Sequence, residues 1–477
     1  MKNSVTKSRI TIVSVLAIFG GYVYADVWDL VPGFFTLKDS AGLAQPYPQA
    51  NPEAHLEPRL KSDNGSTRNN KSSNNPELQL PAADVNAPLP EKGKLADILQ
   101  EFARNPEMNG QVSAVIADVA TREVLAELNA DRPATPASVN KLLTAAAVLS
   151  AYNPNTTFAT ETKFADGTLY LIAGGDVLLA ADAGNEDAVA GHAGLGDLAR
   201  ETAVNLKQQK ITAVDLVLDA ALFADEDYAP GNDANIMQWV MAASPIAVNR
   251  NLDESGKFLP QPRERAVNIF AQHLQNAGIG VKSVNFARTP AEARGLARVN
   301  SAPLREIVDL TLLQSDNTLA ETLGHLAAVK NGKHADFAGA GEAVRSELAK
   351  LGFSTAGTVL ADSSGLSEAN KLTAALVNQI LLQIGNCDRS SCASLLSALP
   401  VSQLDGTLSG RFADLPVAGK VRAKTGSLGS VTSMAGLLYT NAGRMLSFVV
   451  IVDGVPEDGA YGLRPLLDGV IAKIIAA

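Results

Sequence analysis

Residues 134–148 read ATPASVNKLLTAAAV, a run of small and apolar residues interrupted by one lysine. Thr135 is expected to cap a helix whose first position suits Pro136. Ser138 would then lie in the first turn, where backbone N–H groups lack partners and the helix dipole is positive. Lys141 follows three residues later and shares that face of the helix. The stretch predicts either a surface helix that begins near a serine, or a nucleophile with its base.

A lysine acts as a base near neutral pH only if its pKa falls well below the usual value of about 10.4. The decrease needed is about 3 units, on the order of 4 kcal/mol, and burial or a second nearby cation can supply it. The Ser-x-x-Lys spacing alone decides little, because a second copy runs from Ser4 to Lys7.

Two further short motifs follow in the chain. Ser315-Asp316-Asn317 lies between two helical patterns, and Asn317 is expected to cap the second helix. Lys424-Thr425-Gly426 ends a strand-like segment. A second Ser-Asp-Asn, at residues 62–64, falls in a polar spacer and is set aside. The order Ser-x-x-Lys, Ser-x-Asn, Lys-Thr-Gly is much rarer than any one of its parts, and it favours a catalytic interpretation.

Composition excludes several other functions. The chain has 477 residues, 46% of them hydrophobic, and a formal net charge of −10, which does not suit nucleic-acid binding through a basic surface. It contains no HExxH, P-loop or GxSxG motif, and its five histidines are scattered. These absences argue against a Ser-His-Asp hydrolase and against a zinc enzyme. Cys387 and Cys392 are the only cysteines, and their spacing allows either one small disulfide loop or two free thiols.

The N-terminus predicts export. Basic residues precede an uncharged run, Ile10 to Ala25, so residues 1–25 are interpreted as a signal peptide, with an uncleaved membrane anchor as the alternative. Residues 26–91 are rich in Pro, Asn and Ser and predict a disordered spacer. The bulk of the chain is therefore expected on the extracytoplasmic side of a membrane, in the periplasm or cell wall.

The remaining chain alternates between strand and helix patterns. Strands are expected at 111–119 and 123–128 and again in a meander of three near the end, followed by a closing helix at 464–475. Between them lies a compact α/β segment at 158–231, then helical patterns at 264–278, 303–313 and 318–329. This arrangement predicts one α+β domain, 92–157 with 232–477, interrupted by an inserted α/β domain at 158–231.

The three motifs resemble the signature of the penicillin-recognising serine enzymes. Four further stretches, ADSSGLSEANKLTA (361–374), LPVSQLDGTLSGRF (399–412), AASPIAVNRN (242–251) and SAPLREIVDLTLLQSDN (301–317), are similar to the low-molecular-mass class C penicillin-binding proteins, the D-alanyl-D-alanine carboxypeptidase/endopeptidase family. The resemblance implies a β-lactamase-like transpeptidase fold, in which helices cover an antiparallel sheet beside a helical subdomain. It also implies peptidoglycan stem peptides as substrates, β-lactams as covalent inhibitors, and a reaction that needs neither a metal nor another cofactor.

The same resemblance implies a role for each motif residue. Ser138 would attack the carbonyl of a D-Ala-D-Ala or cross-link bond, and Lys141, kept neutral partly by the charge of Lys424, would accept its proton. Ser315 would relay a proton to the leaving amine, and Asn317 would hold Lys141 and the substrate. The remaining implied roles are carboxylate binding by Lys424 and Thr425, a substrate-binding position for Gly426, and an oxyanion hole formed by the backbone N–H groups of Ser138 and Ser427.

Two alternatives stay open at this level. A β-lactamase would use the same motifs but would release penicillin quickly. A non-catalytic wall-binding protein could share the fold, although the intact motifs argue against it. The sequence does not distinguish carboxypeptidase from endopeptidase activity.

Overall fold

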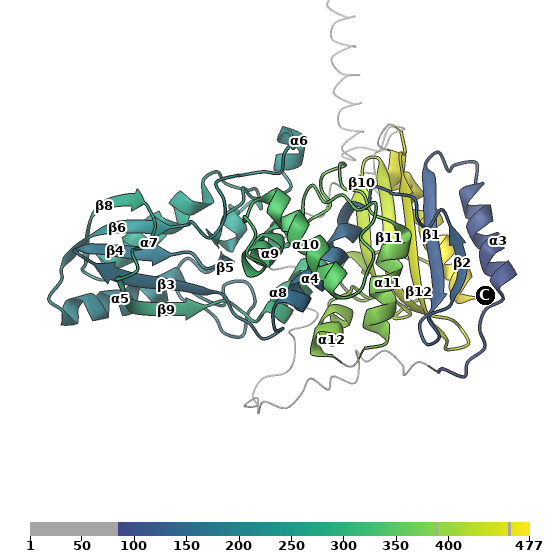
Figure 1. The fold of residues 1–477 in the computed structure, drawn as a ribbon, viewed down its shortest axis with the longest axis horizontal. Coiled ribbons are helices and arrows are strands. Elements are labelled where there is room, and N and C mark those ends of the chain that lie inside the picture. Colours follow the sequence, from purple (N-terminus) through teal and green to yellow (C-terminus); the bar gives the residue numbers. More distant parts are fainter. Residues whose placement is uncertain (1–83, 388, 457–458) are drawn as a thin grey trace, which may run out of the picture. The chain divides into compact units, whose positions relative to one another are not determined.

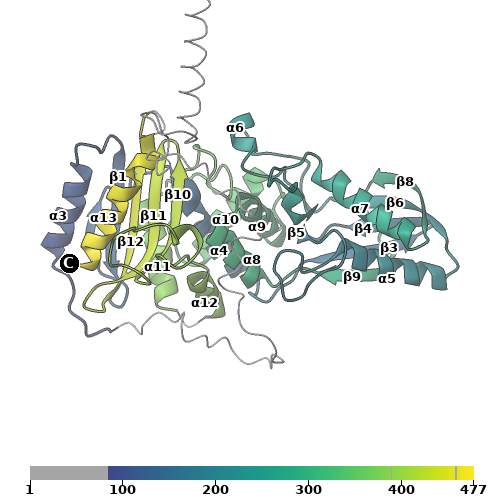
Figure 2. The same ribbon diagram turned by 180° about the vertical axis from the view of Figure 1, so that it is seen from behind.

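A computed structural model describes residues 84–387, 389–456 and 459–477, shown in Figures 1 and 2. The predicted signal segment and the spacer up to residue 83 lie outside the described residues. The described chain already packs before residue 92, where the spacer was expected to end: Ala87 is buried, and its carbonyl oxygen and that of Val85 accept hydrogen bonds from Arg444. The expected boundary at 91 is therefore too late. No helix within the described ranges is long and apolar enough to cross a bilayer.

The main sheet combines strands from the two ends of the described chain. Its order is β10-β11-β12-β1-β2, and every neighbouring pair is antiparallel. The strands are β1 (Gln111–Asp118), β2 (Val124–Leu128), β10 (Val421–Leu428), β11 (Val431–Tyr439) and β12 (Met445–Asp453). The predicted pair of early strands and the late meander are confirmed, and they meet where β1 pairs with β12.

Both faces of this sheet are covered, as the alternation of side chains along β12 shows. Val449 and Ile451 belong to the apolar core beneath α11 (Ala374–Gly385), whereas Val450 and Val452 pack in the core with α3 (Lys92–Ala103) and α13 (Arg464–Ile475). Figure 1 shows α11 against the sheet, and Figure 2 shows α13 on the opposite face. The two-residue period of a strand thus gives one core on each side.

The helical part packs around α4 (Asn140–Ala151), in which every residue from Asn140 to Leu149 is buried. A helix buried on all sides runs through the interior of its domain. Helices α9 (Asn317–Lys330) and α10 (Phe337–Lys350) contact α4 and each other. Two more helices, α8 (Leu304–Gln314) and α12 (Ser390–Ser397), complete the layer, and short 3-10 turns lie at Ala137–Val139, Asn249–Asn251, Gly406–Leu408 and Gly459–Leu463. The α+β class and the sheet covered by helices are confirmed.

A second sheet forms the inserted part, with the order β8-β6-β4-β3-β9. Its strands are β3 (Ala159–Ala165), β4 (Thr168–Ile172), β6 (Ala213–Asp219), β8 (Gly280–Phe286) and β9 (Arg294–Asn300). Helices α5 (Leu195–Gln208) and α7 (Pro262–Asn276) cover it. A short parallel pair, β5 (Asp176–Leu179) with β7 (Ile246–Val248), and a one-turn helix, α6 (Ala234–Met237), accompany it.

The inserted sheet extends further along the chain than the sequence indicated. Strands β8 and β9 are hydrogen-bonded members of it, so the expected end at residue 231 is too early. The physical reason is that β8 is mostly exposed and β9 buries only Ala297, which leaves no clear apolar alternation in either.

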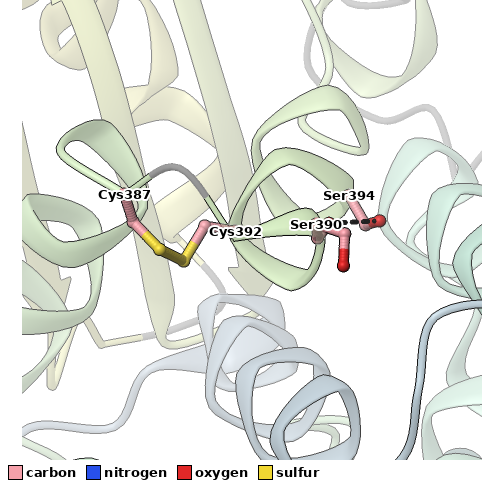
Figure 3. Close-up of a disulfide and its surroundings, with 4 residues drawn as sticks. All are labelled: Cys387, Ser390, Cys392 and Ser394. Carbon is pink, nitrogen blue, oxygen red and sulfur yellow. Dashed lines mark hydrogen bonds between the residues drawn. A yellow bond between two sulfur atoms is a disulfide. The ribbon is translucent and has the colours of Figure 1, made fainter. Parts of the chain in front are cut away.

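Cys387 and Cys392 form a disulfide, which settles the alternative that their spacing left open (Figure 3). The bond closes the connection between α11 and α12, and Cys392 is buried.

Candidate functional site

Ser138 lies on a tight turn at the edge of the main sheet. The helix that the sequence predicted from Pro136 starts later: residues Ala137–Val139 form a 3-10 turn, and α4 begins at Asn140. The reason is the left-handed backbone of Ala137, whose φ of 48° interrupts a continuous helix. Thr135 does not cap the 3-10 turn or α4. The Thr135 hydroxyl accepts a hydrogen bond from Lys371 and bonds to no helix N–H group.

Lys141 reaches back along α4 to Ser138. Its Nζ lies 2.9 Å from Ser138 Oγ, 2.7 Å from Asn317 Oδ1 and 2.8 Å from the carbonyl oxygen of Ser364. A neutral amine has two N–H donors and one lone pair. If the N–H groups point at the two carbonyl-type oxygens, the lone pair points at the serine hydroxyl. In that arrangement Lys141 can accept a proton from Ser138.

The second motif sits where α8 ends and α9 begins. Ser315 terminates α8 in the left-handed conformation, with φ of 58°. Asp316, rather than the expected Asn317, caps α9: its Oδ1 accepts the N–H of Leu319 at 2.9 Å. Because Asn317 is not the cap, its side chain bonds to two other parts of the chain. Its Oδ1 faces Lys141, and its Nδ2 donates to the carbonyl oxygen of Trp239 at 2.9 Å.

The third motif lies on β10, the edge strand of the main sheet. Lys424 Nζ donates to Ser315 Oγ at 2.8 Å and to the carbonyl oxygen of Thr425 at 2.8 Å, and its side chain is buried. Thr425 Oγ1 lies 2.9 Å from Thr407 Oγ1. Gly426 lets β10 lie close to the turn that carries Ser138, because a Cβ at this position would lie 3.1 Å from the backbone nitrogen of Ser138. The three motifs thus converge, with β10 beside Ser138.

Burial lowers the pKa of both amines. The pKa of Lys141 falls to about 8, mainly through burial, while the carboxylates of Asp362, Glu321 and Asp316 oppose that decrease. Burial, and then the charge of Lys141, hold the pKa of Lys424 well below its usual value. Burial, and not the expected charge of Lys424, thus accounts for the lowered pKa of Lys141; the charge effect between the two amines lowers the pKa of Lys424. Two amines sharing one buried site do not both hold a proton easily, which favours one neutral amine near pH 8.

Two buried carboxyl groups hold the segment that faces Lys141, and no sequence motif predicted them. Glu321 on α9 accepts the N–H groups of Ser363 and Ser364, each at 2.9 Å. Asp362 accepts the N–H groups of Gly365 and Ser367. Burial, followed by the charge of Asp362, raises the pKa of Glu321 to about 8. These bonds fix the segment whose Ser364 carbonyl faces Lys141. The only sequence signal was the stretch 361–374, which carried a resemblance but no assigned role.

Within the described ranges no cluster of histidine, cysteine or acidic side chains could hold a metal ion. The groups that the structure brings together at the site are hydroxyls, amines and amides. They can carry out proton transfer and nucleophilic attack by a serine.

Comparison with known proteins gives a family and a fold. Residues 95–255 and 258–472 match the model of the D-Ala-D-Ala carboxypeptidase 3 (S13) family. A carboxypeptidase of Mycobacterium tuberculosis is 32% identical, covering 83% of this chain and 86% of that protein. The carboxypeptidase DacB of Mycolicibacterium smegmatis is also 32% identical, covering 80% of this chain and 85% of its own length.

Among solved structures, penicillin-binding protein 4 of Haemophilus influenzae superposes with a TM-score of 0.64 at 20% identity, covering 80% of this chain and 98% of that one. A structure of the same protein complexed with a β-lactam gives a TM-score of 0.61. These two likenesses show the fold, and the family match covers most of the chain. The protein therefore belongs to the D-Ala-D-Ala carboxypeptidase 3 (S13) family.

Proposed function

We propose that this protein is an exported serine DD-peptidase that cleaves D-Ala-D-Ala bonds, or D-Ala-containing cross-links, of peptidoglycan peptides through an acyl-enzyme on Ser138. The observation that carries the proposal is the 2.9 Å contact between Ser138 Oγ and Lys141 Nζ. The amine also contacts the side-chain oxygen of Asn317 and the carbonyl oxygen of Ser364, both of which can accept its N–H groups. Neutral Lys141 takes the hydroxyl proton as the Ser138 oxygen attacks the scissile carbonyl carbon.

The rest of the site stabilises the charges that develop. The backbone N–H groups of Ser138 and Ser427 bind the oxyanion, and Lys424 with Thr425 binds the terminal carboxylate of the peptide. Ser315, hydrogen-bonded to Lys424 Nζ, passes a proton to the leaving amine as the C–N bond breaks. Water then attacks the ester, adds its hydroxyl to the acyl carbon and returns a proton to Ser138. Asn317 positions Lys141 and the peptide backbone, and Gly426 lets the substrate approach β10.

A β-lactam would acylate the same serine, because its strained amide presents a carbonyl to the same nucleophile. The location that we propose is the extracytoplasmic side of a membrane, in the periplasm or cell wall, reached through the signal peptide or anchor at 1–25. The disulfide between Cys387 and Cys392 supports this location, since disulfides persist in oxidising compartments.

The test measures two reactions of one preparation: labelling by a fluorescent penicillin, and release of D-alanine from a pentapeptide ending in D-Ala-D-Ala. We expect both from the wild type and neither from Ser138→Ala. Ser150→Ala is a matched control, because Ser150 lies on the same helix α4 and bonds Glu347 away from the motifs. It should keep both reactions. A wild type that is neither labelled nor active would overturn the proposal and would favour a wall-binding protein.

The same label separates a peptidase from a β-lactamase. A DD-peptidase holds the acyl group for many minutes, whereas a β-lactamase loses it within seconds as water enters. Digestion of isolated peptidoglycan then assigns the finer activity: loss of terminal D-alanine from monomers shows a carboxypeptidase, and loss of cross-linked dimers shows an endopeptidase.

A further inference from the structure

A segment in the middle of the inserted part lies against the second motif. We call residues 239–251 the contact segment; it contains β7, which pairs in parallel with β5, and the 3-10 turn Asn249–Asn251. It bonds three consecutive residues of the second motif and α9. The carbonyl oxygen of Trp239 accepts from Asn317 Nδ2 at 2.9 Å, and the N–H of Met241 donates to Thr318 Oγ1 at 3.0 Å.

The third bond is ionic and buried. Arg250 Nη1 donates to Asp316 Oδ2 at 2.7 Å, and the two side chains are only 3% and 11% exposed. Asp316 uses its other oxygen to cap α9, so the carboxylate is held from two directions between Ser315 and Asn317. A charge-assisted bond of this length is among the stronger polar contacts, and it fixes direction as well as distance.

The backbone of the contact segment is strained where Arg250 meets Asp316. Asn249, Arg250 and Asn251 all have positive φ, at 44°, 54° and 56°. Asparagine tolerates the left-handed region, but arginine with its Cβ does so at a cost in free energy. The strain is held in place by Asn251, whose Nδ2 donates to the carbonyl oxygen of Leu259, and by Arg265, which donates to that of Val248. Strained backbone that neighbours over-determine is typical of sites where a side chain must be aimed.

From these contacts we infer that the contact segment is the positioning device of the second motif, and that Arg250 acts through Asp316 to hold Ser315 and Asn317 at the distances from Lys424 and Lys141 that acylation needs. Arg250 is a positioning residue: it touches no reacting atom. The inference rests on the proposed function of Ser138, and it gives the inserted part a role at the site through β7 and the turn that follows it.

The first test compares acylation rates of folded proteins with a fluorescent penicillin. Arg250→Met removes the cation and leaves Asp316 buried without its partner, so we expect acylation to slow by about 10- to 100-fold and the melting temperature to fall. Arg250→Lys keeps the charge but not the planar geometry, and should restore part of the rate. Acylation of Arg250→Met at the wild-type rate would overturn the inference.

The second test separates positioning from stability. The double variant Arg250→Met/Asp316→Asn removes the unpaired charge and keeps an acceptor that can cap α9. We expect its melting temperature to return towards the wild-type value while acylation stays slow. If the rate recovers together with the melting temperature, Arg250 is merely structural and the inference is wrong. The double variant also serves if Arg250→Met does not fold.

Arg411→Met is the matched control. It breaks another ion pair of low exposure, between Arg411 and Asp468, whose side chains are 14% and 10% exposed. That pair joins the segment after the turn at 406–408 to α13, and its carboxylate does not belong to the second motif. We expect destabilisation without a change in the acylation rate of the folded protein. Absence of labelling in the wild type would instead refute the proposed function, so the two failures are distinguishable.

Discussion

The buried amine of Lys141 is one of the groups of this site whose pKa is shifted towards neutrality. Burial brings the pKa of Lys141 from 10.5 to about 8, even though three carboxylates act in the opposite direction. Keeping the protonated amine in this position costs about 3 kcal/mol of folding free energy. The cost is present below pH 8 and disappears as the pH rises towards 10.5, because the unfolded chain then loses the same proton. In the mechanism that we propose, this loss of stability at neutral pH accompanies the use of Lys141 as the base.

We therefore expect the acylation rate to rise with pH through about 8 and then to level off. Below that pH Lys141 is mostly protonated and cannot accept the proton of Ser138; above it the neutral amine predominates. The measurement is the second-order rate constant for a fluorescent penicillin from pH 6 to 9.5, with the melting temperature recorded at each pH as the control. A rate that is flat or falls across this range would refute the assignment of Lys141 as the base.

Site residues whose partners lie nearby in the sequence could be predicted, whereas site residues with distant partners could not. Ser138 and Lys141 are three residues apart and meet through a tight turn and the start of one helix, so their spacing revealed the contact. Glu321 and Arg250 act on groups far along the chain, through backbone N–H groups in one case and a buried carboxylate in the other. No local pattern distinguishes such a glutamate or arginine from an ordinary charged residue.

At the scale of elements, the closeness of β10 to the turn that carries Ser138 defines the site. Ser433 Oγ on β11 donates to the carbonyl oxygen of Pro136 at 2.7 Å, which holds the turn that carries Ser138 against the main sheet. Gly426 makes the close approach possible, because an added Cβ would lie 2.2 Å from Ser433 Oγ and 2.7 Å from that carbonyl oxygen.

Gly426→Ala should slow acylation by about 10²-fold, because the methyl group forces β10 away from Ser138 and opens the space where the oxyanion binds. Gly469→Ala is the control: Gly469 lies inside α13, nothing lies within 4 Å of its added Cβ, and alanine favours the helix by up to about 1 kcal/mol. It should raise the melting temperature and leave acylation unchanged. Equal rates for the two variants would argue against β10 as a wall of the site.

Helices and strands could be predicted from the sequence where one face, or every face, of the element is buried. The closing helix and the late meander combine long apolar runs with clear ends, and they form as expected. The turn at Ala137–Val139 was not foreseen, because a left-handed alanine leaves no trace in composition. The strands β8 and β9 were not predicted because most of their residues face solvent, so that apolar and polar residues do not alternate with a two-residue period.

At the scale of the whole molecule, the disulfide stabilises a surface connection and leaves the site untouched. It closes a loop with a sequence separation of 5, for which the chain-entropy model gives about 2 kcal/mol. In a folded body of this size, Cys387→Ala/Cys392→Ala should lower the melting temperature by about 2–4 °C without slowing acylation. Dithiothreitol should reproduce the decrease in the wild type and have no effect on the variant. Loss of acylation upon reduction would show that the α11–α12 connection supports the site.

The pairing of β1 with β12 has a consequence for biogenesis. Strand β1 is synthesised early, yet its neighbour in the sheet belongs to the last tenth of the chain, and Lys424 and Gly426 arrive only shortly before it. Contacts between such distant segments form late and slowly during folding. In the export that we propose, a polypeptide still emerging through a channel would carry Ser138 without Lys424 and β10 beside it. We expect that premature termination anywhere before residue 421 yields a product that a fluorescent penicillin does not label.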